Sequence, residues 1–371
     1  MRRLNSKPRP QWQRKVEEAG LLWHSGITPY WTESAFYEFT AAQVDELETA
    51  TNELWRISLE AAEYVIDNKL YSRLAIPDHA IPLIERSWEK APPSLYGRFD
   101  FAFDGVNPVR LLEFNADTPT SLLEASVVQW YWLQEVAPER DQFNSLHERL
   151  IERWKELSPY LPDRHIDFCS LDDLEDGATV TYLLDTARQA GLDCMAMPIT
   201  EIGWNGTEFV RPDGRPLSAV FKLYPWEWMI HEEFGKYIGL AKTLWIEPAW
   251  KMLLSNKGIL PMLWELFPGH PNLLEARFGD PGSMSEWVRK PLLSREGASV
   301  TLHRADTEIH TEGEYGEEGF VYQAIAPLGC FEGKYPVIGS WLIGDIPAGI
   351  GIRESATPIT TNTSQFVPHL F

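Results

Sequence analysis

The sequence predicts a mixed α/β fold, with mixed or antiparallel sheets flanked by helices. Three observations predict it. A long N-terminal stretch repeats apolar residues at spacings of three and four, which is the period of an amphipathic helix. From Arg98 the apolar residues alternate, as they do in strands. In the middle of the chain, a helical pattern separates two short apolar runs, which predicts a βαβ-like unit.

The N-terminal part is predicted to be mainly helical, over residues 11–75. The signal is clearest over residues 41–68, for which Thr40 is a plausible N-cap. The periodic apolar residues are Val44, Leu47, Ala50, Leu54, Ile57, Ala61 and Val65. Prolines at positions 77, 82, 92 and 93 then indicate turns and one short helix.

A β-hairpin is predicted next, with strands at residues 98–103 and 110–115. The intervening segment contains Asp104-Gly105 and Asn107-Pro108, which are typical of turns. A helix is expected to follow from Thr120 to Val136.

The rest of the chain is predicted to continue as one unit without a long linker. The βαβ-like unit has strands at 166–169 and 194–199, around a helix at about 177–190. A strand, a turn and a helix are expected over 219–230, and a further helix with Pro261 near its start. Later strands are expected near 285–291, 320–325, 336–343 and 348–353. We therefore predict interleaved lobes, approximately residues 1–160, 161–250 and 251–371.

The charge of the chain restricts its partners. Lys and Arg number 33 and Asp and Glu 54, so the formal net charge is −21. Such a charge disfavours binding to nucleic acid and to anionic membranes, because its field repels phosphate. It would attract cationic substrates, although acidity can also serve solubility alone.

The sequence also predicts a cytoplasmic location. No stretch approaches the roughly 20 apolar residues of a membrane helix, and the basic N-terminus has no apolar run of the signal-peptide type. Cys169, Cys194 and Cys330 lie far apart. Their spacing matches neither a disulfide framework nor a metal site, so a reducing compartment is expected.

The hairpin carries the strongest chemical signal. If residues 104–109 form its loop, Asp100 faces Glu113 and Arg98 faces Asn115, on one side of the pair. The core side would then consist of Phe99, Phe101, Phe103, Leu112 and Phe114. Two carboxylates and an amide oxygen suit Mg²⁺, and a neighbouring arginine suits a transferring phosphoryl group. The alternative is a solvated polar face.

Basic residues farther along the chain could contact phosphates. Lys257 precedes a glycine, and Lys290 lies on a strand that leads into the small-residue loop 293–299. Backbone N–H groups of such a loop can bind phosphate, although it matches neither a Walker A loop nor a dinucleotide fingerprint. Arg353, beside Gly351, suits a phosphate or a carboxylate. Taken singly, each lysine is better interpreted as an ordinary solvated lysine, and the alternative for Arg353 is a turn arginine on the surface.

The segment Arg98-Phe-Asp100, followed by Glu113-Phe-Asn115-Ala-Asp117-Thr118, resembles the glutathionylspermidine synthase family. The segment 255–260, the Lys290 strand with its loop, Tyr322-Gln323 and Gly351-Ile-Arg353 resemble it too. The likeness runs over nearly the whole chain, in order. It is closest to the stand-alone acid–amine ligases of this family, which lack the N-terminal amidase domain.

This resemblance implies an ATP-grasp fold with the metal-ligand hairpin in its N-terminal part. It also implies an ATP-dependent ligase that activates a carboxylate as an acyl phosphate and joins it to an amine. Its substrates would be a peptide or glutathione-like acid and a polyamine-like amine. The implied Mg²⁺ ligands are Asp100, Glu113 and Asn115, and Arg98 would be catalytic. ATP would contact Arg98, Lys257, Lys290, Gln323 and Arg353. Asp117, Thr118 and Arg353 would meet the acid, and Glu227 the amine.

One segment departs from the family pattern. Residues 359–363 read Ile-Thr-Thr-Asn-Thr, where the bifunctional enzyme has a Lys-rich stretch, so a cationic contact is expected to be absent. Two other functions stay open at this point. Sixteen tryptophans motivate a carbohydrate-active enzyme with Asp100 and Glu113 as acid and base. The third possibility is an ATP-binding protein without catalysis.

Overall fold

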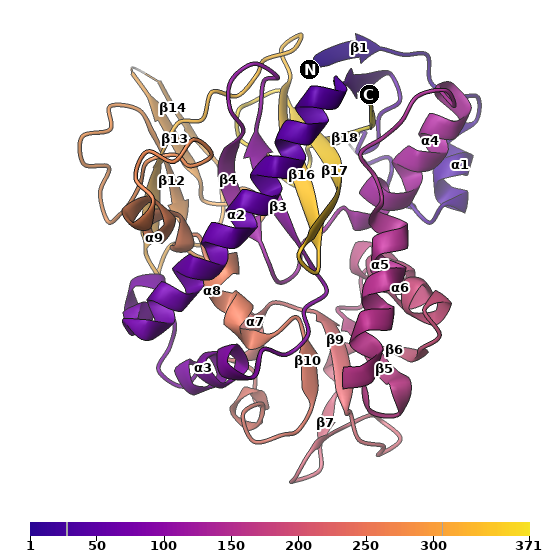
Figure 1. Ribbon diagram of the computed structural model, residues 1–371, viewed down its shortest axis with the longest axis vertical. Helices are drawn as coiled ribbons and strands as arrows, with labels where there is room; N and C mark the ends of the chain where they lie inside the picture. The colour runs from indigo at the N-terminus through magenta and orange to yellow at the C-terminus, as the bar shows by residue number, and fades with distance from the viewer. Residues whose placement is uncertain (27–28, 306) are drawn as a thin grey trace.

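The computed structural model describes residues 1–26, 29–305 and 307–371. Its central sheet is antiparallel, in the order β18-β17-β16-β3-β4 (Figure 1). The strands are β3 (Tyr96–Ala102), β4 (Arg110–Asn115), β16 (Tyr335–Ile343), β17 (Ile346–Ser355) and β18 (Gln365–Val367). Strands from the N-terminal and C-terminal parts of the chain therefore pair in one sheet. The three lobe boundaries themselves stay a prediction.

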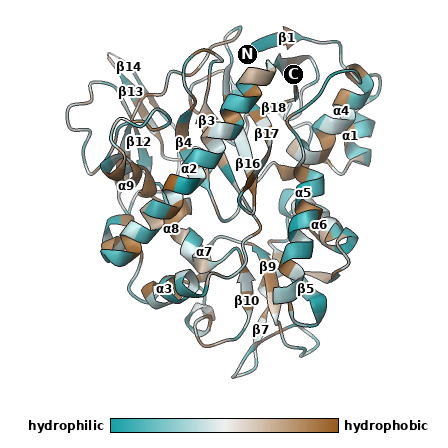
Figure 2. Cartoon of the chain, in the orientation of Figure 1, coloured by the Kyte–Doolittle hydropathy of each residue, from teal (hydrophilic) through white to brown (hydrophobic). Residues whose placement is uncertain are grey.

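The long helix α2 (Ala41–Asp67) crosses this sheet (Figure 1). Thr40 caps it in a reciprocal capping box with Gln43, which confirms the predicted start. Its predicted apolar face is buried, and Figure 2 shows hydrophobic and hydrophilic residues alternating along it. No helix in the described part of the chain is both long and apolar enough to span a membrane.

Residues 11–75 were predicted to be mainly helical. This prediction was wrong for the segment between the first helix and α2, which contains a strand. The first helix, α1 (Trp12–Glu18), ends before Gly20, whose φ is +97°. β2 (Ala35–Glu38) pairs with β1 (Arg2–Asn5) and with β19 (His369–Leu370). These partners lie at the two chain ends, so no local pattern predicts them. Positions 27 and 28 lie outside the described residues.

A parallel sheet, in the order β10-β9-β5-β6, occupies the middle of the chain. Its strands are β5 (His165–Ser170), β6 (Asp193–Pro198), β9 (Ala219–Leu223) and β10 (Leu244–Ile246). Helix α6 (Leu174–Gln189) joins β5 to β6, which confirms the predicted βαβ unit. The short helix α7 (Trp226–Met229) follows β9, and α5 (Leu146–Leu157) lies beside α6. Residues 203–210 form the small β7 (Gly203–Trp204) and β8 (Phe209–Val210) hairpin.

The third large sheet is antiparallel, in the order β11-β15-β12-β13-β14. Its strands are β11 (Ala276–Phe278), β12 (Trp287–Pro291), β13 (Thr301–Arg304), β14 (Thr307–His310) and β15 (Phe320–Ala324). Before it come α8 (Met252–Ser255) and α9 (Ile259–Leu266), the latter with Pro261 near its start as predicted. Helix α3 is Ile81–Lys90, and the expected helix after Thr120 consists of a π-helical stretch, Glu124–Val128, and α4 (Gln129–Val136).

The predicted hairpin register is confirmed where it matters for the site. Arg98 pairs with Asn115 and Asp100 with Glu113, but beyond Asp100 the register shifts, so that Phe101 pairs with Leu111. The bulge turns Leu111 into the core, whereas Leu112 is half-buried and lines a cavity. The assignment of Leu112 to the core was therefore wrong.

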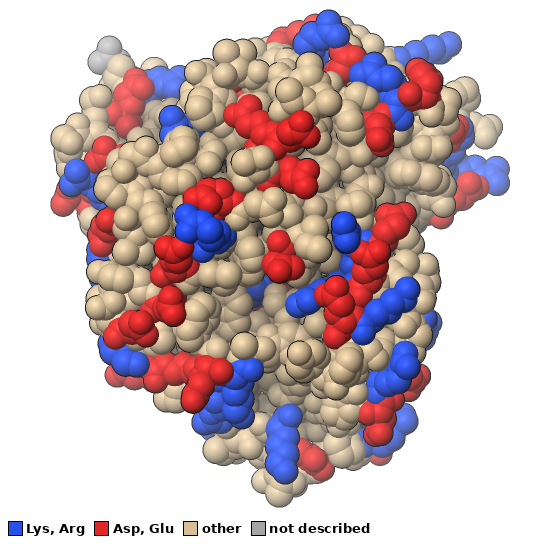
Figure 3. All heavy atoms as spheres, in the orientation of Figure 1, with Lys and Arg blue, Asp and Glu red and all other residues tan. Residues whose placement is uncertain are grey.

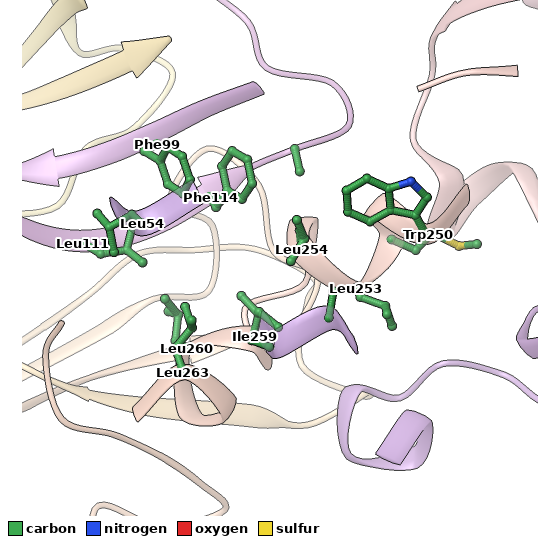
Figure 4. Close-up of a cluster of buried hydrophobic side chains, with 14 of the residues drawn as sticks. Leu54, Phe99, Leu111, Phe114, Trp250, Leu253, Leu254, Ile259, Leu260 and Leu263 are labelled. Atoms are coloured by element: carbon green, nitrogen blue, oxygen red, sulfur yellow. The ribbon is translucent and has the colours of Figure 1, made fainter. Parts of the chain in front are cut away.

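Apolar packing fixes the hairpin relative to the helices that follow the parallel sheet. The rings of Phe99 and Phe114 stack with their centroids 3.8 Å apart. Figure 4 shows them beside side chains of α8 and α9, including Leu254 and Ile259. Because Lys257 lies between α8 and α9, this packing places it next to the polar side of the hairpin.

Candidate active site

A cavity lies between the central sheet and the β11–β15 sheet, and it brings together residues from distant parts of the chain. Nine of the eleven predicted site residues line it. They are Arg98, Asp100, Glu113, Asn115, Thr118, Lys257, Lys290, Gln323 and Arg353. The two predicted residues that are not part of its lining are Asp117 and Glu227.

Asp100 lies between two arginines on the polar side of the hairpin. Arg98 Nε donates to Asp100 Oδ1 at 2.6 Å, and Arg353 Nη2 donates to Oδ2 at 3.2 Å. Asn115 Nδ2 lies 3.4 Å from Asp100 Oδ2 and 3.3 Å from Glu113 Oε1. Asp100 is 3% exposed. The two carboxylates and the amide therefore converge within one hydrogen-bonded group.

Glu113 faces two lysines from the C-terminal part of the chain. Lys257 Nζ lies 3.1 Å from Glu113 Oε2. Burial by itself raises the pKa of Glu113, but the charges of Lys257 and Lys290 outweigh it and lower the pKa to about 2. Burial lowers the pKa of Lys290 to about 8, with Glu113 opposing the shift.

The charges of this cavity leave a surplus of cations. Asp100 and Glu113 face Arg98, Arg353, Lys257 and Lys290, so two negative groups meet four positive ones. A buried positive surplus attracts polyanions such as phosphate chains. Two carboxylates and an amide oxygen are also ligands that Mg²⁺ prefers, with phosphate oxygens and water completing its shell.

Part of the cavity lining is apolar. Its walls include Val288, Leu302, Ile325, Leu328 and Val337. Such a lining suits a flat heterocycle better than a phosphate.

Gln323 borders the apolar part of the cavity, where its side-chain amide is already bonded. It accepts from Lys290 Nζ at 2.7 Å, and its Nε2 donates to the Leu111 carbonyl at 3.0 Å. Gln323 therefore ties β15 to the hairpin at the same place where the predicted contact with adenine would occur.

The small-residue loop 293–299 closes one side of the cavity. Lys257 Nζ donates to the Ser294 carbonyl, and Glu296 and Gly297 line the cavity. Gly297 has a φ of +68°, and a Cβ there would lie 2.3 Å from the Thr360 carbonyl oxygen. The loop thus needs glycine where it packs against residues 358–360.

Asp117 is buried away from the cavity. Lys222 Nζ donates to Asp117 Oδ1 at 2.6 Å, and the Trp226 backbone N–H donates to Oδ2 at 2.9 Å. The side chains of Asp117 and Lys222 are 1% and 0% exposed. Burial raises the pKa of Asp117 and lowers that of Lys222. In this geometry Asp117 holds the start of α7 and does not reach the cavity itself.

Glu227 is connected to the cavity by an arginine that sequence reasoning missed. Arg295 Nε donates to Glu227 Oε1 at 3.1 Å, and its Nη1 donates to Thr118 Oγ1 at 2.9 Å. Arg295 lines the cavity and joins two residues expected to meet the substrates. Its place in the small-residue loop, five positions after Lys290, is the signal that could have identified it.

A group of acidic residues adjoins the arginine side of the cavity and was also missed. Glu124 is 1% exposed and accepts from the Tyr30 hydroxyl at 2.7 Å, whereas its Oε2 has no partner among the described residues. Burial, with repulsion from Glu124, raises the pKa of Glu175 to about 8. Burial, with repulsion from Asp173, raises that of Asp176 to about 7. Glu175 and Asp176 are neighbours in the first turn of α6, whereas Glu124 lies about 50 positions earlier, so only the fold reveals that Glu124 belongs to the group.

Comparisons with known proteins identify the family of the chain. A family model described as glutathionylspermidine synthase preATP-grasp matches residues 3–371. The chain is 42% identical, over the full length of both proteins, to a Haemophilus influenzae protein named as a candidate acid–amine ligase. It is 26% identical to the Escherichia coli bifunctional glutathionylspermidine synthetase/amidase, covering 90% of this chain and 58% of that protein.

Two further comparisons concern how much of a larger relative the chain covers and how similar its fold is to a solved structure. Trypanothione synthetase of Crithidia fasciculata is 29% identical, over 83% of this chain and 52% of that protein. The chain thus spans little more than half of these two larger relatives. A glutathione synthetase-like effector of Globodera pallida superposes with a TM-score of 0.60, covering 98% of both chains at 8% identity. At that identity the likeness concerns the fold alone.

Proposed function

The chain belongs to the glutathionylspermidine synthase family, and from this premise we propose that it is an ATP-dependent carboxylate–amine ligase with an ATP-grasp fold. One observation carries the proposal. Four cations surround two carboxylates and an amide in one cavity, between two antiparallel sheets. This combination suits a nucleoside triphosphate with its metal ion beside the carboxylates and its base against the apolar part of the lining.

We assign the nucleotide site as follows. Asp100, Glu113 and Asn115 would hold Mg²⁺, which supplies charge neutralisation for the phosphates when bound. Lys257 and Lys290 would contact the phosphates, in place of their present partners Glu113 and Gln323. Gln323 would border the adenine.

The proposed reaction has two steps. An oxygen of the acid's carboxylate attacks the γ-phosphorus of ATP, and ADP leaves, with Arg98 and Arg353 stabilising the charge of the transferring group. A neutral amine then attacks the carbonyl carbon of the acyl phosphate. Phosphate leaves and the nitrogen loses a proton, which gives the amide. The chain's side chains need only position and neutralise the reactants.

The acid substrate would lie near Thr118 and Arg353. Asp117 would fix the segment that carries Thr118, because it accepts a hydrogen bond from the Trp226 backbone N–H. We propose a peptide or glutathione-like acid, because the same segment resembles that of the family. Residues 359–363 carry no cation, so the acid's contacts at that place must differ from those of the bifunctional enzyme.

The amine substrate is proposed to be cationic and polyamine-like. Glu227 and the group Glu124, Glu175 and Asp176 adjoin the cavity. Figure 3 shows acidic side chains spread over the displayed face, interspersed with basic ones. Because the pKa values of Glu175 and Asp176 lie at about 8 and 7, these carboxylates ionise as the pH rises through that range. Affinity for a cationic amine would rise with them.

A carbohydrate-active enzyme is not favoured by this geometry. Such an enzyme needs a carboxylic acid that stays protonated near neutral pH. The pKa of Glu113 is lowered to about 2, because two lysines outweigh its burial, and Asp100 is bonded to two arginines.

The proposal is tested by an ATP-dependent phosphate-release screen over pooled thiol peptides, amino acids and polyamines, followed by mass detection of the amide. We expect release of phosphate and ADP with one acid–amine combination, and an amide product that lacks one water relative to the two substrates. Tight MgATP binding without phosphate release from any pool would instead support an ATP-binding protein without catalysis.

A further inference from the structure

A second cavity lies in the parallel-sheet region, and none of its lining residues borders the active-site cavity. It has a volume of about 310 Å³. Its apolar walls include Ile199, Ile202, Met229, Phe234, Ile238 and Trp245. We call it the Trp245 pocket. Trp245 is 6% exposed and Ile238 4%, so the inner wall belongs to the folded core.

The Trp245 pocket lies outside the carboxyl ends of the parallel strands. Leu171 directly follows β5, Ile199 follows β6 and Tyr224 follows β9, and all three line the pocket. The chain leaves β5 toward β6 on one side and later returns to β9 on the other side of β5. In open parallel sheets, ligands bind outside the carboxyl ends at this kind of switch point.

The mouth of the pocket is acidic. Glu232 and Glu233 line it, and neither has an ion-pair partner among the residues that the structure describes. Glu232 accepts a hydrogen bond from the Tyr224 hydroxyl. The nearby cation Lys236 lies over the ring of Tyr237, 5.0 Å from its centroid. Apolar walls with an anionic mouth complement an ammonium group carried on an apolar body.

A chain of side-chain contacts links this pocket to the active site. The ring of Tyr224 meets Trp228 edge-on, with centroids 5.6 Å apart. The Arg295 guanidinium lies 5.5 Å from the centroid of Trp228. Arg295 itself lines the active-site cavity and contacts Thr118 and Glu227. The pocket residue Tyr224 and the active-site residue Arg295 thus contact the same side chain, Trp228.

We propose that the Trp245 pocket binds the distal end of a substrate, in the form of a cationic amino group on an apolar body. This inference rests on the proposed ligase function, because the reacting end of the same molecule lies in the active-site cavity. The distal end belongs either to the acid, as the amino terminus of a peptide does, or to the amine, as the second nitrogen of an aliphatic diamine does.

The binding chemistry is tested by calorimetric titration of the whole protein with n-hexylamine, 1-hexanol and hexanoate. We expect saturable one-site binding of n-hexylamine, at least tenfold weaker binding of hexanol, and none of hexanoate. The double variant Glu232→Gln/Glu233→Gln should lose at least tenfold in affinity for n-hexylamine. Ile238→Trp, which fills the pocket, should abolish binding.

A matched control removes the same charge elsewhere. Glu48→Gln/Glu63→Gln changes two exposed carboxylates on α2 and should bind n-hexylamine as the unaltered protein does. All variants are compared by circular dichroism, so that loss of folding is recognised. Equal binding of amine and alcohol, or unchanged binding in both pocket variants, overturns the proposal.

The role in the reaction is tested with the substrate pair identified by phosphate release. Glu232→Gln/Glu233→Gln should raise the KM of one substrate at least tenfold and leave the KM of ATP unchanged. The substrate affected identifies whether the acid or the amine occupies the pocket. Unchanged KM values for both substrates overturn the inference while the ligase function stands. Hexylamine binding without any ligase activity would contradict the proposed function and overturn the substrate role of the pocket, leaving only a site for an ammonium group on an apolar body.

Discussion

Glu113 illustrates how single residues in this cavity depend on partners that are distant in sequence. Its carboxylate stays ionised although it is buried, because Lys257 and Lys290 supply opposing charge. A nucleotide with its metal ion would exchange these partners. Glu113 and Asn115 would turn to the metal, and the two lysines to the phosphates.

Loss of a metal ligand should abolish turnover without unfolding the protein. In Glu113→Ala or Asn115→Ala, we expect Mg-ATP-dependent phosphate release to fall at least ~100-fold, because charge stabilisation of the transferring group is lost. Circular dichroism and thermal unfolding check the fold, and Glu63→Gln on the exposed face of α2 serves as the control. Normal turnover in both variants would rule out the metal assignment.

Lys290 should make ATP binding depend on pH. Burial lowers its pKa to about 8, so the free protein loses this positive charge as the pH rises from about 7 to 9. Affinity for MgATP, measured by titration without other substrates, should be constant below pH 7 and decline above 8. In Lys290→Arg the charge persists, and the decline should disappear. A profile that is identical in both proteins would exclude Lys290 as a phosphate ligand.

At the scale of elements, the hairpin and its bulge decide which side chains reach the cavity. Alternation predicts the face that carries Arg98, Asp100, Glu113 and Asn115, and this part of the register is confirmed. The bulge then exchanges the roles of two neighbouring leucines. Leu111 is fully buried in the core, and Leu112 lines the cavity.

The two leucines should therefore respond differently to truncation. Leu111→Ala removes core packing and should lower the free energy of unfolding by about 2–5 kcal/mol. Leu112→Ala should cost less, about 1 kcal/mol, since the side chain is only half-buried, and should raise the KM of ATP. Urea unfolding and ATP kinetics measure the two effects. Equal losses of stability would contradict the bulged register.

Elements encoded by local patterns could be predicted from the sequence. The capping box at Thr40 and Gln43 defines the start of α2, and the apolar spacing defines its buried face. β1, β2 and β19 could not be predicted, because each consists of only two to four residues, and β2 pairs with β19 near the other end of the chain.

The same distinction applies to the site. Residues within the hairpin share one alternation, so their convergence could be inferred from it. Arg295 and Glu227 are 68 positions apart, and Lys222 meets Asp117 across 105 positions. Such contacts exist only once the three large sheets have assembled, and no spacing in the chain encodes them.

On the scale of the whole molecule, an acidic protein surrounds a cationic cavity. The formal net charge is −21, whereas six cationic residues and three carboxylates line the cavity. Long-range charge is screened within about 10 Å at moderate ionic strength. The local surplus would therefore govern ATP binding, and the carboxylates next to the cavity, rather than distant surface charge, would attract a cationic amine.

The most direct test of the central claim follows oxygen from the acid to the phosphate. The protein is incubated with MgATP, the amine and the acid identified by phosphate release, with the acid's carboxylate labelled with ¹⁸O. Attack of that carboxylate on the γ-phosphorus predicts one ¹⁸O atom in the released phosphate, with ADP as the other product. Unlabelled phosphate, or AMP and pyrophosphate in place of ADP, would contradict a ligase that works through an acyl phosphate.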